Sequence, residues 1–289
     1  MSPRLRREVY TVGWICALPV ELAAAQEMLD EEHAALERDP KDNDENLYSL
    51  GSIAGHNVVI GCLPASRIGN NPAAAVATQM RATFKGIRFG LMVVGIGGGV
   101  PGAEVDIRLG DVAVSQPQQT LRGVIHYDMG KATPSGFQRT GSLNSPPQII
   151  LGAVTIFRRK NVGPDVLFEA TYDHEGGQTY DPCSADRQEA RSSRESEGVV
   201  VHYGVIASGN QVMRDAAQRD KVSANFGGVL CFETEAAGLM NSFPCLVIRG
   251  ISDYADSHKN KSWQAYAAGI AAANAKELLS VIPATAVTE

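Results

Sequence analysis

Residues 230–256 read LCFETEAAGLMNSFPCLVIRGISDYAD, and the other segments can be interpreted by what they add to this stretch. Its first part predicts a short helix that begins with acidic residues, followed by a turn at 241–244. The apolar run 245–251 predicts a buried strand that carries Ser252 and Asp253 at its carboxyl end. Carboxylates in that position are what α/β enzymes use on polar small molecules.

Strands and helices alternate along the chain. Buried strands are predicted at residues 10–17, 89–95, 109–115, 123–131 and 199–207, with a hairpin at 47–62 and a polar loop at 133–147. Helices are predicted at residues 20–29, 72–84, 149–160 and 263–282. This alternation is typical of an α/β fold whose mostly parallel sheet is wrapped by helices.

The composition is that of an ordinary globular protein, with 44% hydrophobic and 20% charged residues among 289. The net charge of −6 argues against a general nucleic-acid-binding surface. The five cysteines form no CxxC pair, so we expect free thiols in a reducing compartment and no zinc site. Pro19 and Glu21 interrupt the N-terminal apolar run, which is too short to span a bilayer. We therefore expect a cytoplasmic protein without a metal or cofactor.

Four candidate site segments follow predicted strands: Glu21, the glycines within 95–99, residues 208–212, and the pair Ser252 and Asp253. Ligands of parallel sheets bind at the carboxyl ends of the strands, so these segments are expected at one edge. Structural alternatives exist, since Glu21 also suits the first turn of a helix and Asp253 a helix N-cap. The glycines do not form GxGxxG, so no dinucleotide site is predicted.

Six motifs occur in the order and spacing of the nucleoside phosphorylase/nucleosidase superfamily. They are ICALPVE (15–21), VVGIGGGV (93–100), LGDVAVS (109–115), IASGNQV (206–212), FETEAAG (232–238) and VIRGISDYAD (247–256). The sequence resembles this family over residues 10–283. It looks closest to a fungal branch whose members often form the effector domain of larger immune-receptor-like proteins.

The resemblance implies a single three-layer α/β/α domain over residues 8–283, with a central mostly parallel mixed sheet. Residues 173–198 are expected to be a surface insertion or lid. Residues 1–7 and 284–289 are expected to be flexible termini. Members of the family usually form homo-oligomers, so we expect one here.

The chemistry implied by the resemblance is cleavage of a purine N-glycosidic bond. The bond breaks through an oxocarbenium-like state, and a proton or hydrogen bond at purine N7 lowers the barrier. Asp253 is implied as the general acid, supported by Ser252. Glu235 is implied to bind the ribose hydroxyls, with the backbone around Thr234 lining the sugar. Glu233 is expected to point to another helix face, so at most one of the two glutamates should touch the sugar.

The purine is expected to lie against Asn210, Val212 and the glycine stretch around Gly97. Asn210 also suits a helix N-cap. The family often has an aromatic residue at the position of Val212. We therefore expect Tyr254 or another aromatic side chain to stack on the base.

Two pairs of positions separate hydrolysis from phosphorolysis. Phosphorylases grip phosphate with an Arg and a Ser beside the glycine strand, where this chain has Val93 and Ile96. Nucleosidases hold the attacking water with a Glu and an Arg that Glu21 and Arg249 match, although they also have a Ser where this chain has Ile96. The resemblance thus implies hydrolysis, with Glu21 as general base and Arg249 positioning the water or a neighbouring carboxylate. A structural ion pair is the alternative for Arg249.

The implied substrate is an adenine nucleoside or nucleotide, adenosine or ATP, cleaved to adenine and ribose or ribose phosphate. A triphosphate requires cations beyond the ribose, and four loop residues are candidates: Arg67, Lys131, His258 and Lys259. Each is also suited to a solvated surface. A phosphate-dependent phosphorylase is the alternative enzyme, and a non-catalytic nucleotide-binding module is the alternative of another class.

Overall fold

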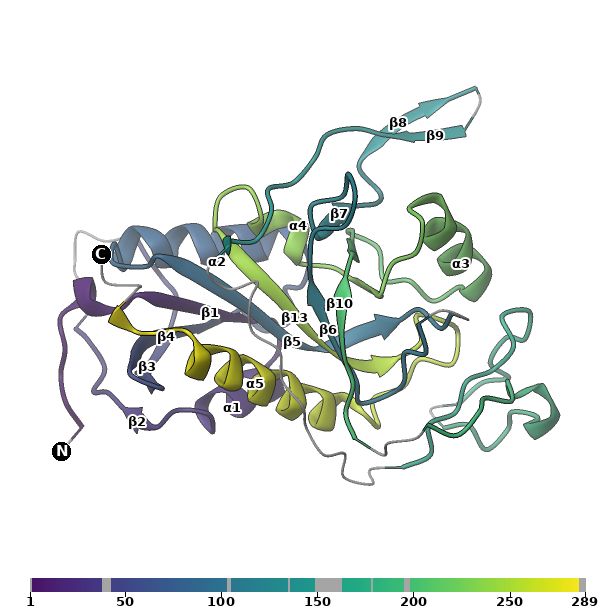
Figure 1. The fold of residues 1–289 in the computed structure, drawn as a ribbon, viewed down its shortest axis with the longest axis horizontal. Helices are drawn as coiled ribbons and strands as arrows, with labels where there is room; N and C mark the ends of the chain where they lie inside the picture. Colours follow the sequence, from purple (N-terminus) through teal and green to yellow (C-terminus); the bar gives the residue numbers. More distant parts are fainter. Residues whose placement is uncertain are drawn as a thin grey trace.

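Strand β5 (Phe89–Gly99) lies near the middle of an 11-stranded mixed sheet. The computed structural model describes residues 2–37, 43–102, 105–134, 136–148, 163–177, 179–194 and 198–285. Strand β5 pairs in parallel with β1 (Val12–Cys16) on one side and with β13 (Cys245–Asp253) on the other. The predicted α/β fold is therefore confirmed (Figure 1).

The sheet extends on both sides in the order β10-β6-β13-β5-β1-β4-β3-β2. Strand β4 (His56–Cys62) is parallel to β1 and forms the predicted hairpin with β3 (Tyr48–Ile53). The short edge strand β2 (Glu31–Glu32) follows. On the other side, β6 (Val112–Ser115) is antiparallel to β13, and β10 (Val201–Gly204) is parallel to β6. The sheet is thus mixed, as expected.

A small branch joins β11 (Ile206–Ser208) to β7 (Val124–His126) and β12 (Cys231–Glu233), and β12 joins β5. The single strand predicted at 199–207 is wrong, because β10 and β11 pair with different neighbours. The helix predicted at the start of 230–256 is also wrong, since β12 pairs with both β11 and β5. Only the short helix α4 (Ala236–Leu239) follows.

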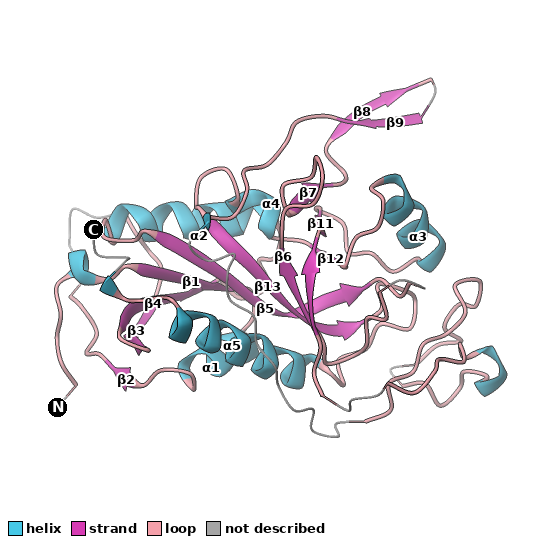
Figure 2. Ribbon diagram, viewed as in Figure 1, coloured by secondary structure: helices cyan, strands magenta, loops and turns pink. Residues whose placement is uncertain are grey.

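Two layers of helices cover the sheet. Helices α1 (Pro19–Gln26) and α5 (Gln264–Val281) lie on one face, and α2 (Asn70–Thr83) lies with α4 on the other (Figure 2). Alternate residues of β5 explain this arrangement, because side chains of a strand point to opposite faces. Leu91 and Val93 pack in the cluster that includes the alanines of α5, whereas Met92 and Val94 pack with α2. Helix α3 (Ala216–Asn225) follows β11.

Peripheral segments depart from the expectations. The hairpin of β8 (Gly130–Thr133) and β9 (Gly136–Arg139) projects from the body, where a polar loop was predicted (Figure 1). The helix predicted at 149–160 lies outside the described residues. The described part of 173–198 contains a short 3-10 helix at Ala185–Arg187. A second short 3-10 helix, at Arg7–Val9, lies near the N-terminus. All five cysteines are free. No helix in the described ranges is long and apolar enough to cross a membrane.

Close contact between β5 and α5 depends on glycine. A Cβ built at Gly95 would lie 2.4 Å from the backbone N of Ala268. Gly269, one residue further along the helix, faces open space. The lack of a side chain at Gly95 therefore lets the helix backbone approach the strand.

We expect Gly95→Ala to lower the free energy of unfolding by about 3 kcal/mol, because the helix backbone must move away. Gly269→Ala is the matched control and should raise stability by up to about 1 kcal/mol through helix propensity. Urea unfolding monitored by circular dichroism measures both. Equal stability of Gly95→Ala and wild type would contradict the close seating of α5.

Candidate active site

A cavity of about 200 Å³ lies at the carboxyl ends of β1, β5, β12 and β13. Its polar lining residues are Gln211, Glu233, Thr234, Glu235, Asp253, Lys259 and Gln264, and its apolar ones include Ala17, Leu18, Ile68, Val94, Ile96, Val212, Met213 and Phe232. The four segments predicted at strand ends therefore meet at one edge of the sheet.

Glu21 lies beneath the cavity wall in the first turn of α1 and is 2% exposed. Its Oε2 accepts hydrogen bonds from the backbone N–H groups of Ala17 and Leu18, both at 2.8 Å. Its Oε1 accepts one from Gly95 at 2.8 Å, so the carboxyl bridges the end of β1 and the middle of β5. Burial raises the pKa of Glu21 to about 7, although these donors act in the opposite direction.

Arg249 of β13 is fully buried between two carboxylates. Its Nη2 forms an ion pair with Glu233 Oε2, and its Nη1 lies 3.4 Å from Glu235 Oε2. Arg249 is therefore placed to hold neighbouring carboxylates, which was one of its two expected roles. Water positioning by Arg249 stays a prediction.

Glu233 and Glu235 both line the cavity, but from different local structures. Glu233 ends β12, and its carboxylate accepts hydrogen bonds from the N–H groups of Glu235 and Ala236 at 3.1 and 3.0 Å. Glu235 precedes α4, and its Oε1 accepts from the hydroxyl of Thr234 and from Gly69 N at 3.3 Å. The expectation that the two lie on different faces of a helix is wrong, because Glu233 belongs to a strand. Whether one of them touches a sugar stays a prediction.

Asp253 is the last residue of β13 and is 3% exposed. Its Oδ1 accepts a hydrogen bond from Ala255 N at 3.0 Å. Its Oδ2 accepts one from Ser252 Oγ at 3.0 Å and forms an ion pair with Lys259 Nζ. Ser252 therefore contacts Asp253, and its supporting role in catalysis stays a prediction. Both oxygens of Asp253 therefore accept hydrogen bonds, and Oδ2 is in addition paired with an ammonium group.

The expected base site is only partly assembled. Val212 lines the cavity with half of its surface exposed, whereas Asn210 does not line it. The Asn210 backbone N–H donates to Asp128 at 2.7 Å, and its side-chain oxygen accepts from Asn70 at 3.1 Å. Gly97 pairs with Ile251, while its neighbours Ile96 and Gly98 line the cavity.

Tyr254 does not supply the expected aromatic surface. Its side chain is buried, with 3% of the residue exposed, and its hydroxyl forms hydrogen bonds with Asp165 and with the backbone N–H of Leu109. Tyr254 is not among the residues that line the cavity. Phe232 of β12 lines the cavity instead. The sequence did not point to Phe232, because its segment was predicted to begin a helix. The adjacent apolar residues Cys231 and Phe232 were the feature that could have indicated a strand there.

Of the four expected phosphate cations, Lys259 lines the cavity. Arg67 is exposed in the loop beside the lining residue Ile68. Lys131 is exposed on the projecting β8–β9 hairpin. His258 is buried against the ring of Phe168 at a centroid distance of 4.0 Å, and burial lowers its pKa to about 4. A neutral buried imidazole cannot act as a phosphate cation near pH 7, so that prediction is not supported.

The glycine strand presents apolar side chains to the cavity. Val94 and Ile96 line it, whereas Val93 points to the α5 side. Among the described residues, no three His, Cys, Asp or Glu side chains are grouped so that they could hold a metal ion. The cavity thus combines an apolar wall with three carboxylates at its surface, those of Glu233, Glu235 and Asp253, and a fourth, that of Glu21, beneath it.

Comparison with known proteins agrees with this geometry. The sequence profile of the family described as "Phosphorylase superfamily" matches residues 11–285. A nucleotide-binding leucine-rich repeat (NLR)-like protein of Hyaloscypha variabilis is 49% identical over 97% of this chain and 30% of its own length. The ATP nucleosidase Cap17 of Escherichia coli is 25% identical over 89% of this chain and 48% of its own length. This chain therefore spans less than half of either relative.

The fold also matches solved structures. A crystal structure of 5′-methylthioadenosine/S-adenosylhomocysteine nucleosidase from Neisseria meningitidis, in complex with methylthio-immucillin-A, has a TM-score of 0.62 and 20% identity. The match covers 94% of this chain and 99% of that one. Together with the profile match over almost the whole sequence, this shows that the chain belongs to the phosphorylase superfamily.

Proposed function

We propose that this chain is a purine N-ribohydrolase that cleaves the N-glycosidic bond of an adenine nucleoside or nucleotide. The observation that carries the proposal is the grouping of carboxyls around one cavity. Glu235 and Asp253 line it beside Glu233, the partner of Arg249, and Glu21 lies buried beneath the wall formed by Ala17 and Leu18. Two relatives whose names are nucleosidases, one by sequence and one by fold, support the reaction class.

Each carboxyl has a distinct task in this reaction. Glu235, fixed by Arg249 and Thr234, binds the ribose hydroxyls and stabilises the positive charge that develops on the sugar. Once Lys259 leaves its carboxylate, Asp253 takes up a proton from water and then donates this proton, or a hydrogen bond, to purine N7. Glu21 removes a proton from the attacking water. Its pKa of about 7 suits a general base at neutral pH.

Hydrolysis is favoured over phosphorolysis by the side chains of β5. A phosphate nucleophile needs cationic or hydroxyl groups, and Val94 and Ile96 offer neither at the cavity. Val93, which the sequence matched to a phosphate-binding position, faces the opposite side of the sheet.

The direct test is a chromatographic product assay with adenosine, inosine, guanosine and ATP, each with and without phosphate. We expect free adenine without added phosphate, and a loss of at least about 100-fold in Asp253→Asn and Glu21→Gln. The exposed Glu27→Gln, at the end of the same helix as Glu21, is the control. Phosphate-dependent release of ribose 1-phosphate would establish the phosphorylase alternative. Binding of adenosine without product would establish a non-catalytic module.

The activity should depend on pH through Glu21. A general base works as the carboxylate, and burial raises the pKa of Glu21 to about 7. We therefore expect kcat/KM to fall about tenfold per unit as the pH drops below this value, because the carboxylate form of Glu21 is lost. A profile from pH 5 to 9 measures this. An acidic limb near pH 4.5 would instead fit an ordinary solvated glutamate and remove Glu21 from the role of base.

We further propose that Lys259 favours a nucleotide over a nucleoside. It is the cationic side chain among the described lining residues, and its ammonium can exchange Asp253 for a phosphate oxygen. That exchange would also remove the ammonium from Asp253, so that its carboxylate can take up from water the proton that it then donates to the purine.

We expect Lys259→Met to lower the ratio of kcat/KM for ATP to that for adenosine at least about tenfold, as loss of a charge-assisted hydrogen bond implies. The ratio is insensitive to partial misfolding, because both substrates are measured on one protein. Lys261→Met, an exposed lysine of the same loop, is the matched control and should leave the ratio unchanged. An unaltered ratio in Lys259→Met would refute this specificity.

The setting of the activity is also a proposal. Because the chain spans 30% of the fungal NLR-like relative, we infer that residues 8–283 form the catalytic module of such a receptor-like protein. A cytoplasmic location and a homo-oligomeric assembly remain predictions from the resemblance.

A further inference from the structure

Tyr254 directly follows the proposed acid Asp253 and is fixed at both ends. Its hydroxyl donates to Asp165 Oδ1 and accepts a hydrogen bond from Leu109 N at 3.3 Å. Its backbone carbonyl accepts from Arg219 Nη1 at 2.7 Å. The side chain is buried, so these contacts form away from bulk water. Tyr254 therefore has little freedom to move.

The turn that Tyr254 supports has an unfavourable backbone. Ala255 has a φ of +53°, in the left-handed region that a residue with a Cβ rarely adopts. The Ala255 N–H donates to Asp253 Oδ1 at 3.0 Å, so this conformation orients the carboxyl. Such a conformation persists only where surrounding contacts enforce it. The contacts of Tyr254 lie immediately before Ala255 and supply that enforcement.

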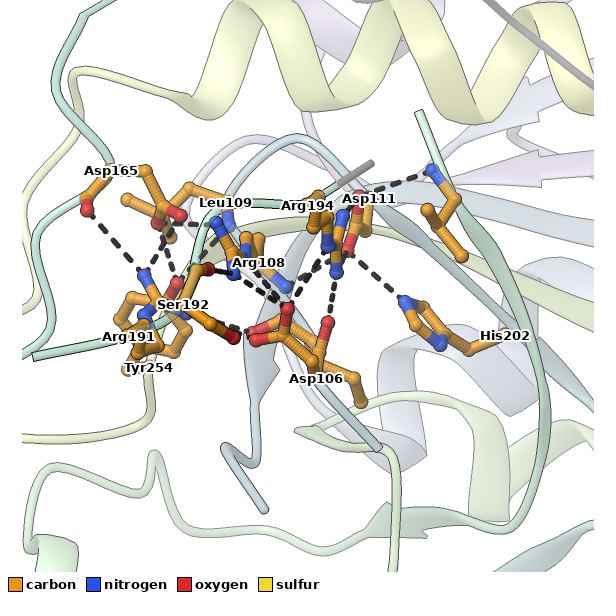
Figure 3. A network of polar contacts seen from close by, with 12 residues as sticks. Asp106, Arg108, Leu109, Asp111, Asp165, Arg191, Ser192, Arg194, His202 and Tyr254 are labelled. Atoms are coloured by element: carbon orange, nitrogen blue, oxygen red, sulfur yellow. Dashed lines mark hydrogen bonds and ion pairs between the residues drawn. The ribbon is translucent and has the colours of Figure 1, made fainter. Parts of the chain in front are cut away.

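Asp165, the partner of the Tyr254 hydroxyl, comes from the described segment 163–177, which lies far from β13 in sequence. Arg191 Nη2 forms an ion pair with Asp165 Oδ2 at 2.8 Å, and its guanidinium lies 5.2 Å from the centre of the Tyr254 ring. Figure 3 shows that these groups belong to one polar network with Arg194 and Asp111. Arg194 binds the fully buried Asp111 at 2.7 Å, which anchors the segment that carries Arg191 to the sheet.

We propose that Asp165 is a positioning residue for Asp253, acting through Tyr254, and that Arg191 fixes Asp165 in place. The inference rests on the proposed function, in which Asp253 acts on the purine. Loss of the contact between Tyr254 and Asp165 lets the turn at Ala255 relax and moves the Asp253 carboxyl away from N7. Ribose binding through Glu235 depends on β12 and Arg249, so it is not affected. Arg191, from the segment 173–198 that was expected to be a surface insertion or lid, thus helps to set the geometry of the acid.

The test measures kcat and KM for adenine release in Tyr254→Phe, Asp165→Ala, Asp165→Asn and the double variant Tyr254→Phe/Asp165→Ala. We expect Tyr254→Phe and Asp165→Ala to lower kcat about tenfold or more, with KM within about twofold of wild type. Asp165→Asn should retain more kcat than Asp165→Ala, because its amide oxygen still accepts from the tyrosine. The double variant should be no more than about twofold slower than the slower single variant, since one contact is removed in both.

Arg194→Met is the matched control. It removes the ion pairs with Asp106 and Asp111, which anchor the same segment without touching Tyr254. We expect it to lower the melting temperature while kcat stays within about twofold of wild type. An equal fall of kcat in Arg194→Met, additive losses in the double variant, or full activity in Tyr254→Phe would each overturn the positioning role. A wild-type chain that released no adenine would overturn the proposed function, and this inference with it.

Discussion

The buried guanidinium of Arg249 is the constraint on which the site depends. A charge withdrawn from water must be paired, and removal of one partner of a buried ion pair costs about 3–5 kcal/mol. Arg249 on β13 finds its partners in Glu233 and Glu235, which end β12 and begin α4. Strands β12 and β13 each pair with β5, and they do not pair with each other in the described sheet. The ion pairs therefore join two strand ends that the sheet ladder does not join directly.

Three of the carboxyls around the cavity are held by three different kinds of partner. Glu21 accepts hydrogen bonds from backbone N–H groups, Glu235 lies beside the guanidinium of Arg249, and Asp253 lies beside the ammonium of Lys259. Environment decides which carboxyl can accept a proton and which remains charged. Burial is the reason that the pKa of Glu21 rises to about 7, and the charge of Arg249 acts in the opposite direction. The proposed division into base, sugar ligand and acid rests on these surroundings rather than on residue type.

The sequence was sufficient to predict the fold and the edge at which the candidate site lies. Continuous apolar runs such as 89–95 and 245–251 identify buried strands, and parallel pairing sends their ends to one side. Local pattern could not predict that β5 continues through its glycines, because the pairing of Gly98 and Gly99 with β12 provides the reason. Local pattern also could not predict that Glu233 ends a strand while Glu235 precedes a helix. The strand is defined by its pairing with β11 and β5, which are distant in sequence. His258 and Tyr254 failed as ligand groups for the same reason: their burial depends on Phe168 and Asp165, which lie far away in sequence.

Segments outside the sheet complete the site that the strand ends begin to form. The ends of β1, β5, β12 and β13 surround the cavity, and loops in such folds commonly supply the residues that distinguish one substrate from another. In this chain we propose that a loop also positions the carboxyl of Asp253. Asp165 is joined to Tyr254 by a hydrogen bond and to Arg191 by an ion pair, within a network rooted in the fully buried Asp111. Changes in such a loop cannot be treated as neutral for catalysis, because the residue after the proposed acid is one of its anchor points.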